Sequence, residues 1–209
     1  MVELSNDEMK WLGENYPSLS YDKAKGIITG FLEFDLCYKD KPRIHDCYKI
    51  KIDLSSIKSR MMLPKVYNID GRINAIAKRK QISTADLHLN SDNTLCLIFP
   101  LKIKDKYPTG VTIQKFIEHL SEHLYWVSFY ERYNKEPWKG EQHSLNALIE
   151  YILENKSVLK DEQMIEFLRI IYGAIYLKFI TRNDLKKKLE NPTFMNEFKI
   201  KCHEQGFIR

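Results

Sequence analysis

Two segments in the first quarter of the chain alternate apolar and charged residues, and this alternation constrains the fold more than any other feature. The clearer segment is residues 48–54, in which four apolar side chains alternate with two lysines and an aspartate. Successive side chains of a strand point to opposite faces of a sheet, which produces this period of two. Residues 26–37 alternate similarly, and the polar connection of residues 39–46 is short. The two segments therefore predict an antiparallel pair with one buried face and one solvated face.

The other segments at the front of the chain are shorter. Residues 63–69 are apolar and end at an Asp-Gly pair, which is typical of a turn. Residues 6–16 have the composition of a short helix, with Ser5 or Asn6 as its capping residue. Residues 78–80 are all basic and are expected to form a loop.

The second half of the chain has helical periodicity. Apolar residues recur every three or four positions from Thr112, which predicts a long helix that ends near Tyr133. No strand pattern follows residue 143. Helices are expected over residues 145–153 and from Asp161, Thr181 and Pro192 onward. We therefore predict an α+β fold in which residues 1–143 form an antiparallel sheet flanked by helices, and residues 144–209 form a helical extension docked on it.

Composition narrows the class of protein. With 44% apolar and 29% charged residues, the chain of 209 residues is expected to be globular rather than disordered. A net charge of +5 is too small and too dispersed to indicate a nucleic-acid partner. The four cysteines are widely spaced and no apolar signal or membrane segment is found, so we expect a reduced, cytoplasmic protein without a membrane partner. No phosphate-cradling or dinucleotide motif is present, and we expect no cofactor.

Cys96 occupies a position that suits a nucleophile. It lies in an apolar segment that directly follows the polar run of residues 88–93, and such a run favours a loop. A partly exposed cysteine beside polar groups forms a thiolate more readily than one in a sealed core. A free cysteine is also often a small packing residue. The residues alone leave both interpretations open.

The segment His119-Leu120-Ser121-Glu122-His123 matches the H-x-x-E-H signature of inverted zinc peptidases. On a helix its two histidines share a face one turn apart, as two zinc ligands must. No third ligand is identifiable, and five-residue matches arise easily by chance. A zinc peptidase is therefore the minor alternative, and we expect no bound metal.

The order of helix, antiparallel strands, polar loop, cysteine and long helix resembles the ubiquitin-conjugating (UBC) fold over about residues 1–140. The resemblance is carried by Met62-Leu63-Pro64-Lys65-Val66, similar to the P-P-K-V segment of that family, His88-Leu89-Asn90, similar to its H-P-N motif, and Leu95-Cys96-Leu97, similar to its catalytic-cysteine segment. Three further segments resemble segments of bacterial conjugating-enzyme-like proteins. Those proteins are encoded in antiphage (CBASS-type) islands or in islands that encode ubiquitin-like proteins. The three segments are Tyr107-Pro108-x-Gly110, the aromatic helix L-Y-W-V-S-F-Y-E-R-Y and residues 137–144.

The resemblance implies a role for each of three residues. Cys96 would carry an acyl group as a thioester. Asn90 would hold the oxyanion of the tetrahedral intermediate, with His88 as an alternative donor or as a base for the attacking amine. The chemistry of the transfer itself adds two further roles: Asp86 or Asp92 would help to orient that amine, and His143 would close over the site from its loop.

The resemblance also implies partners. They are an activating-enzyme-like protein, a ubiquitin-like protein or a cyclic-oligonucleotide synthase (CD-NTase) with a free C-terminus, and an acceptor amine. Leu89 stands where the family has proline. This departure supports an alternative of a different class, a catalytically inactive UBC-like binding module.

Overall fold

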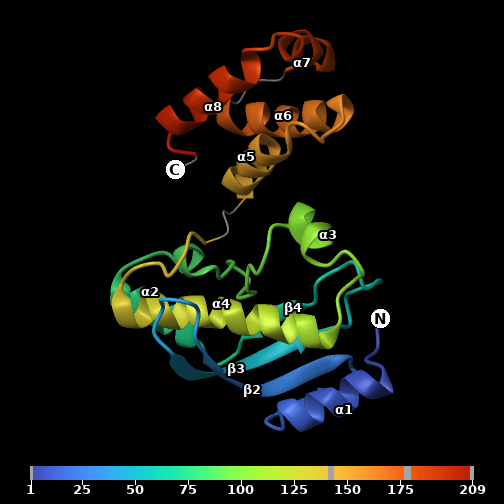
Figure 1. The fold of residues 1–209 in the computed structure, drawn as a ribbon, viewed down its shortest axis with the longest axis vertical. Coiled ribbons are helices and arrows are strands. Elements are labelled where there is room, and N and C mark those ends of the chain that lie inside the picture. The colour runs from blue at the N-terminus through green and yellow to red at the C-terminus, as the bar shows by residue number, and fades with distance from the viewer. Residues whose placement is uncertain (1, 141–143, 177–179, 208–209) are drawn as a thin grey trace. The chain divides into compact units, whose positions relative to one another are not determined.

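The computed structural model describes residues 2–140, 144–176 and 180–207 (Figure 1). The chain divides into two compact units, Met1–Glu141 and Gln142–Arg209. Among the described residues, the first unit contains four strands and helices α1 to α4, and the second contains helices α5 to α8. The fold class is α+β, as predicted.

The strands form one antiparallel sheet in chain order. They are β1 (Leu19–Asp22), β2 (Ile27–Leu36), β3 (Ile44–Asp53) and β4 (Lys65–Asn68). The pairing of β2 with β3 confirms the predicted antiparallel pair. However, β3 begins at Ile44, within the segment expected to be a connection. Ile44 pairs with Leu36 and is fully buried, so burial extends the strand beyond the alternating residues.

The two outer strands were less visible in the sequence. The apolar residues 63–69, for which no type of element was predicted, contain β4, and β1 was not predicted. β1 pairs with β2 in a register that places Leu19 opposite Gly30. A Cβ atom on Gly30 would lie 2.0 Å from the carbonyl oxygen of Ser18. The glycine therefore permits the close approach that brings β1 onto the sheet.

Helix α4 (Ile113–Tyr133) crosses the sheet and packs on β2 and β3 (Figure 1). Its end at Tyr133 confirms the prediction. The predicted apolar stripe is buried, including Phe116, Leu120 and Leu124. His119, His123 and Trp126 are buried as well, although they lie outside that stripe. The loops after α2 and after α4 cover this second side of the helix, which becomes the wall of the pocket described below.

Helix α1 (Asn6–Asn15) is tied to the start of α4 through one carboxylate. Ser5 is the N-cap and forms a capping box with Glu8, which confirms Ser5 among the two predicted caps. The buried Glu8 carboxylate also accepts a hydrogen bond from the Ile113 backbone N–H at 3.1 Å and pairs with Arg60 at 2.7 Å. Burial raises the pKa of Glu8, but the hydrogen bonds from Arg60, Ser5 and Ile113 outweigh it and leave the pKa lowered.

The basic residues 78–80 do not form the expected loop. They make up the last turn of α2 (Arg72–Lys80), which follows the turn predicted at residues 70–71. Ile73, Ile76 and Ala77 supply the buried face of this helix. Positive charge at a helix C-terminus is favourable because the backbone dipole places partial negative charge there. The basic run is therefore a helix end rather than a break in structure.

Three short helical segments connect the main elements of the first unit. They are a 3₁₀ turn at Thr84–Leu87, a second 3₁₀ turn at Pro100–Lys102 and helix α3 (Ile103–Lys106). The first of these precedes the polar run of residues 88–93, and the other two follow Cys96. The chain around Cys96 is thus held between short helical turns rather than in the sheet.

The second unit consists of helices α5 (Ser144–Asn155), α6 (Asp161–Tyr176), α7 (Arg182–Leu189) and α8 (Phe194–Glu204). Thr181 caps α7 with a capping box, as its position predicted. The prediction for α8 was wrong at its start: the helix begins at Phe194, and Pro192 precedes it in a turn. The expected docking of these helices on the first domain stays a prediction.

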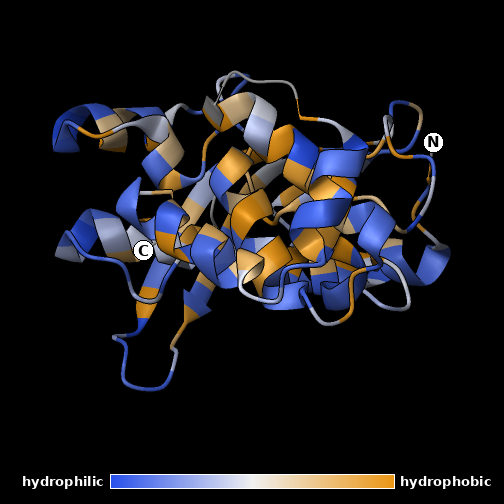
Figure 2. Ribbon diagram, turned by 90° about the horizontal axis from the view of Figure 1, so that it is seen from above, coloured by the Kyte–Doolittle hydropathy of each residue, from blue (hydrophilic) through white to orange (hydrophobic). Residues whose placement is uncertain are grey.

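The helices are mixed in polarity. Figure 2 shows polar residues interrupting the apolar ones along the helices. Within the described parts of the chain, no helix combines the length and the apolar character that crossing a bilayer requires.

Candidate functional site

The polar run before Cys96 folds into a tight turn that returns the chain to its own start. The backbone N–H of Cys96 donates to the His88 carbonyl at 2.8 Å, and Leu89 and Leu95 form a β-bridge within the same turn. His88 has a left-handed backbone conformation, with φ 56° and ψ 35°. Residues with this conformation are often found where function constrains the chain. The turn brings Cys96 and His88 together.

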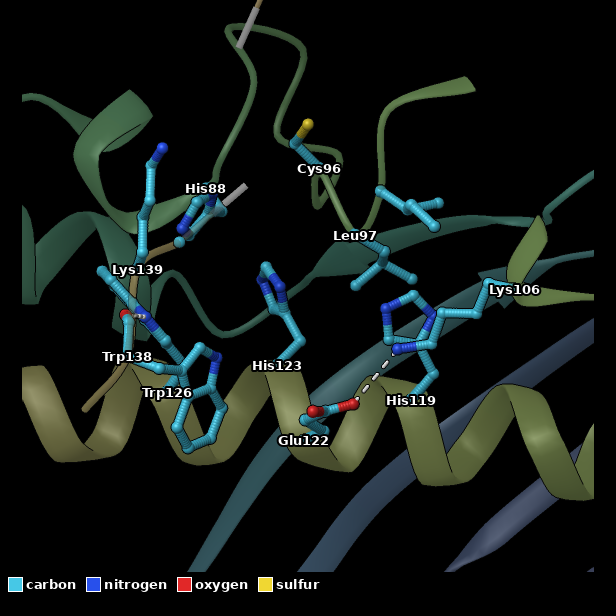
Figure 3. Close-up of a pocket in the computed structure, with 12 residues that line it drawn as sticks. His88, Cys96, Leu97, Lys106, His119, Glu122, His123, Trp126, Trp138 and Lys139 are labelled. Carbon is cyan, nitrogen blue, oxygen red and sulfur yellow. Dashed lines mark hydrogen bonds and ion pairs between the residues drawn. The ribbon is translucent and has the colours of Figure 1, made fainter. Parts of the chain in front are cut away.

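Cys96 lies on the wall of a pocket of about 160 Å³, between its own loop and helix α4 (Figure 3). The cysteine is partly buried. The other lining residues are His88, Leu97, Ile98, Lys106, His119, Glu122, His123, Trp126, Trp138, Lys139 and Gly140. The half-covered thiol therefore shares this pocket with three imidazoles and two lysines.

Two buried histidines from different elements meet in this pocket. His88 comes from the loop, and His123 projects from α4 toward that loop (Figure 3). Their ring centroids are 5.5 Å apart, and the Trp126 indole lies edge-on to His88 at 4.8 Å. The aromatic contacts orient the His88 ring, since edge-to-face pairs have a preferred geometry. His88 and His123 are therefore two imidazoles that line the same pocket as the Cys96 thiol.

The loop after α4 closes the far side of the pocket. The Trp126 indole N–H donates to the Trp138 carbonyl at 3.0 Å, and the Trp138 ring stacks on Tyr125 at 5.7 Å. This anchoring places Gly140 directly against His88. A Cβ atom at Gly140 would lie 2.4 Å from His88 Nε2, so only glycine permits this approach without displacement.

His119 occupies the inner end of the pocket and is held neutral. Its Nδ1 lies 2.7 Å from the Tyr107 hydroxyl. Burial, followed by the positive charge of Lys106, lowers the pKa of His119 to about 4, and a hydrogen bond to the Leu97 backbone opposes this only in part. Lys106 itself pairs with Glu122 at 3.2 Å.

Among the described residues, the structure shows no third ligand that would support the zinc-peptidase alternative. His119 and His123 do lie one turn apart and line one pocket, as their spacing requires. Across residues 2–140, 144–176 and 180–207, however, no group of three His, Cys, Asp or Glu side chains is arranged to hold a metal ion. His119 is committed to Tyr107, and Glu122 is committed to Lys106.

Asn90 and Asp92 lie outside the pocket lining, within the part of the chain that the structure describes. Asn90 is exposed, and its side-chain amide donates to Thr94 Oγ1 at 3.0 Å. Asp92 accepts from the Thr94 backbone N–H at 3.1 Å and from its hydroxyl at 2.5 Å. Both side chains stabilise the turn that positions Cys96. His143 lies outside the described residues.

Several lining residues had no functional role in the sequence-based prediction. His123 was considered only as a zinc ligand, and Trp126, Trp138 and Gly140 were not assigned to a cysteine site. The available signal was that His119, His123 and Trp126 recur at helical spacing beside the apolar stripe of α4. This spacing identifies a second functional face of the helix, but not the cysteine that it meets.

A comparison of the chain with protein-family models, curated proteins and solved structures gave no match.

Proposed function

We propose that this protein is a cysteine acyl transferase, which accepts an activated acyl group on Cys96 and passes it to an amine. The observation that supports this most strongly is that a partly buried thiol lines one pocket together with His88 and His123. A thioester carrier needs a reachable thiolate, and the later attack by an amine needs a group that can take a proton.

The two steps balance in protons and bonds. The Cys96 thiol loses its proton, and the thiolate forms a bond to the carbonyl carbon of an incoming thioester. The tetrahedral oxyanion collapses as the bond to the leaving thiolate breaks, and that thiolate takes up a proton. An amine then attacks the acyl-Cys96 carbonyl, loses a proton to a base and releases the Cys96 thiolate. His88 and His123 supply the base and the hydrogen-bond donors for the oxyanion.

We further propose that the activity is ubiquitin-conjugating-like and serves bacterial antiphage defence. Cys96 would receive the C-terminal glycine of a ubiquitin-like protein or of a cyclic-oligonucleotide synthase from an activating-enzyme-like partner. The motifs around Pro64, His88 and Cys96 support this more specific form. A cytoplasmic location belongs to the proposal, because a catalytic thiol must stay reduced.

A chemical acyl donor tests the proposed acyl transfer on Cys96 without the natural partners. The full chain is incubated with the thiobenzyl ester of N-acetylglycine, and the acylated cysteine is located by peptide mass. We expect the Cys96 thioester to discharge onto free lysine about tenfold faster than the thioester of N-acetylcysteine, because the pocket holds the reacting groups together. Discharge at the rate of the small-molecule thioester would contradict the proposal.

Cysteine variants identify the nucleophile. We expect Cys96→Ala to lose the discharging acyl group completely, with an unchanged melting temperature. Cys47 is also partly buried and lies on β3, so Cys47→Ala is the matched control and should discharge like the wild type. The same two variants are then incubated with the cognate activating enzyme, ATP and modifier. A thiol-sensitive adduct should form on Cys47→Ala and not on Cys96→Ala. An adduct that survives Cys96→Ala would mean that the nucleophile is misassigned.

The placement of Asn90 favours one second candidate, a binding module without catalysis. The residue that resembles the oxyanion-holding asparagine is bonded to Thr94 and exposed, outside the pocket lining. A binding module would keep its cellular function in Cys96→Ala. It would lose that function when an exposed residue of α1 such as Lys10 is changed to glutamate, whereas the transferase behaves in the opposite way.

A further inference from the structure

Thr94 closes the polar turn before Cys96 through every polar group that it has. The residue is 6% exposed. Its hydroxyl accepts from the Asn90 side-chain amide at 3.0 Å and donates to Asp92 Oδ1 at 2.5 Å, and a hydroxyl can do both at once. Its backbone N–H donates to the same Asp92 oxygen at 3.1 Å, and its carbonyl accepts from the Asn90 backbone N–H at 2.8 Å. The acyl-transfer steps proposed above do not use this residue.

The same turn is attached to the edge of the sheet. Thr94 forms an antiparallel β-bridge with Tyr67 of β4. The next residue, Leu95, donates its backbone N–H to the Val66 carbonyl at 2.8 Å. Strand β4 stands at the end of the sheet, so the turn pairs with the outer edge of that strand. The two residues before Cys96 are therefore fixed against the sheet.

The bonds of Thr94 also close the loop that carries the thiol. The loop starts at His88 and returns to it, because the Cys96 N–H donates to the His88 carbonyl at 2.8 Å. Within the loop, the hydroxyl of Thr94 joins the side chains of Asn90 and Asp92, which are both exposed. Water can replace the hydroxyl at these exposed partners. Loss of the hydroxyl should therefore loosen the loop without unfolding the protein.

We propose that Thr94 is a positioning residue for Cys96: its hydroxyl locks the turn of residues 90–94 against β4 and so fixes the backbone that places the thiol on the pocket wall. This inference rests on the acyl transfer proposed above. It assigns Asn90 a role that acts through Thr94 rather than at the reacting carbonyl. Thr94 affects the rate of transfer through geometry, because a small displacement of a reacting group slows a reaction strongly.

The test measures transfer and local opening in the same full-length variants. Each protein is acylated with the thiobenzyl ester of N-acetylglycine, and the discharge of Cys96 onto free lysine is followed by mass. Hydrogen exchange of the amides of residues 95 and 96 is measured alongside. Thr94→Val removes the hydroxyl and keeps the shape of the side chain, whereas Thr94→Ser keeps the hydroxyl.

Ser128→Ala is the matched control for the loss of a buried hydroxyl. Ser128 is fully buried, and its hydroxyl also donates to an aspartate, Asp46, at 2.8 Å. It lies on α4 outside the pocket lining. We expect this variant to lower the melting temperature and to discharge like the wild type.

We expect Thr94→Val to slow discharge about tenfold and to speed exchange of the two amides. Thr94→Ser should discharge within about twofold of the wild type, because its hydroxyl can still bond to both partners. Asn90→Ala should slow discharge in the wild-type background. In the Thr94→Val background it should add less than about twofold, because two residues that act through one contact are not additive.

The outcomes separate this inference from the proposed function. If the wild type forms no discharging acyl group on Cys96, the proposed function fails, and the positioning role fails with it. If the wild type discharges, the positioning role alone is overturned by any of three results: Thr94→Val discharges equally well, Thr94→Ser is as slow as Thr94→Val, or the slow variant shows unchanged exchange. Equal slowing in Ser128→Ala also overturns it, since a general loss of stability then explains the rate. Full multiplication of the Asn90→Ala and Thr94→Val effects would overturn the role given to Asn90.

Discussion

Two polar clusters line different parts of helix α4, and they are built in opposite ways. Near the C-terminal half of the helix, Asp46 on β3 pairs with Arg72 at 2.6 Å and accepts from Ser128 at 2.8 Å and from Arg132 at 3.3 Å. Arg72 also pairs with Glu131 at 2.8 Å. This cluster, which we call the Asp46 cluster, consists of charged groups joined directly to one another.

The pocket around Cys96 is built mainly of imidazoles, indoles and a thiol that surround open space. Among its lining residues that the structure describes, the one carboxylate, Glu122, is paired with Lys106. Charges that satisfy each other directly stabilise a fold but leave no group for a ligand. Titratable groups that line a cavity contribute less to stability and can contact a ligand that enters it. The comparison predicts that damage to the Asp46 cluster lowers stability, whereas damage to the pocket lowers activity.

The largest effect on stability should come from Asp46→Ala. Removing this carboxylate leaves Arg72 partly buried with only Glu131 as a charged partner. We expect a loss of about 3 kcal/mol in the free energy of unfolding, measured by urea denaturation. The matched control is Asp35→Ala, which breaks the ion pair with Arg43 on the surface and should have little effect. Equal losses in the two variants would contradict the distinction between the clusters.

Acid should lower the free energy of unfolding through the Asp46 cluster by slightly less than Asp46→Ala does. Burial raises the pKa of Asp46, but hydrogen bonds from Arg72, Ser128 and the Cys47 backbone lower it from the ordinary 3.8 to about 2. A depressed pKa in the folded state stabilises the protein above the unfolded value, and this contribution is lost as the pH falls from about 4 to about 2. We expect the wild type to lose about 2 kcal/mol over this range from this group.

Asp46→Asn isolates that contribution, because it cannot ionise. Urea denaturation at pH 5 and at pH 2 should show a smaller acid-induced loss for this variant than for the wild type. The other acids of the protein titrate in both proteins and cancel in the difference. An identical loss in the two proteins would mean that the pKa of Asp46 is the same in the folded and unfolded states.

The smallest effect on stability is expected from Gly140→Ala, which changes the pocket. The new methyl group would meet His88 Nε2 at 2.4 Å, so the ring or the loop must move. We expect about a tenfold slower discharge of acyl-Cys96 with a nearly unchanged free energy of unfolding. Gly13→Ala on α1 is the control, because nothing lies within 4 Å of its Cβ and the activity should be unaffected. Slower discharge in both variants would argue against a specific contact with His88.

Local patterns predicted the parts of the fold that repeat along the chain. The alternation around residues 48–54 predicted β3, and the period of apolar residues from Thr112 predicted α4 up to Tyr133. The four-residue strand β1 offered too few positions to establish a period. Helix α2 was missed because its basic end was taken as a loop, although Ile73, Ile76 and Ala77 carry a helical spacing.

The candidate site was only half predictable for a similar reason. Cys96 and His88 belong to one loop, so their proximity follows from local sequence. The direction of Asn90 was decided by its bond to Thr94, within a turn whose geometry the residue types do not specify. His123 and Gly140 come from distant elements, and their approach to His88 depends on how α4 and its following loop pack.

By itself the sequence determined the α+β class, the main helix and strands and the position of one cysteine after a polar loop. These depend on periodicity and on turn-forming residues, which act over a few neighbours. Only the tertiary structure decided that the second face of α4 meets the loop of Cys96, and that His119 Nδ1 bonds to the Tyr107 hydroxyl. Such contacts join residues far apart in the chain. Packing selects among arrangements that the local sequence does not distinguish.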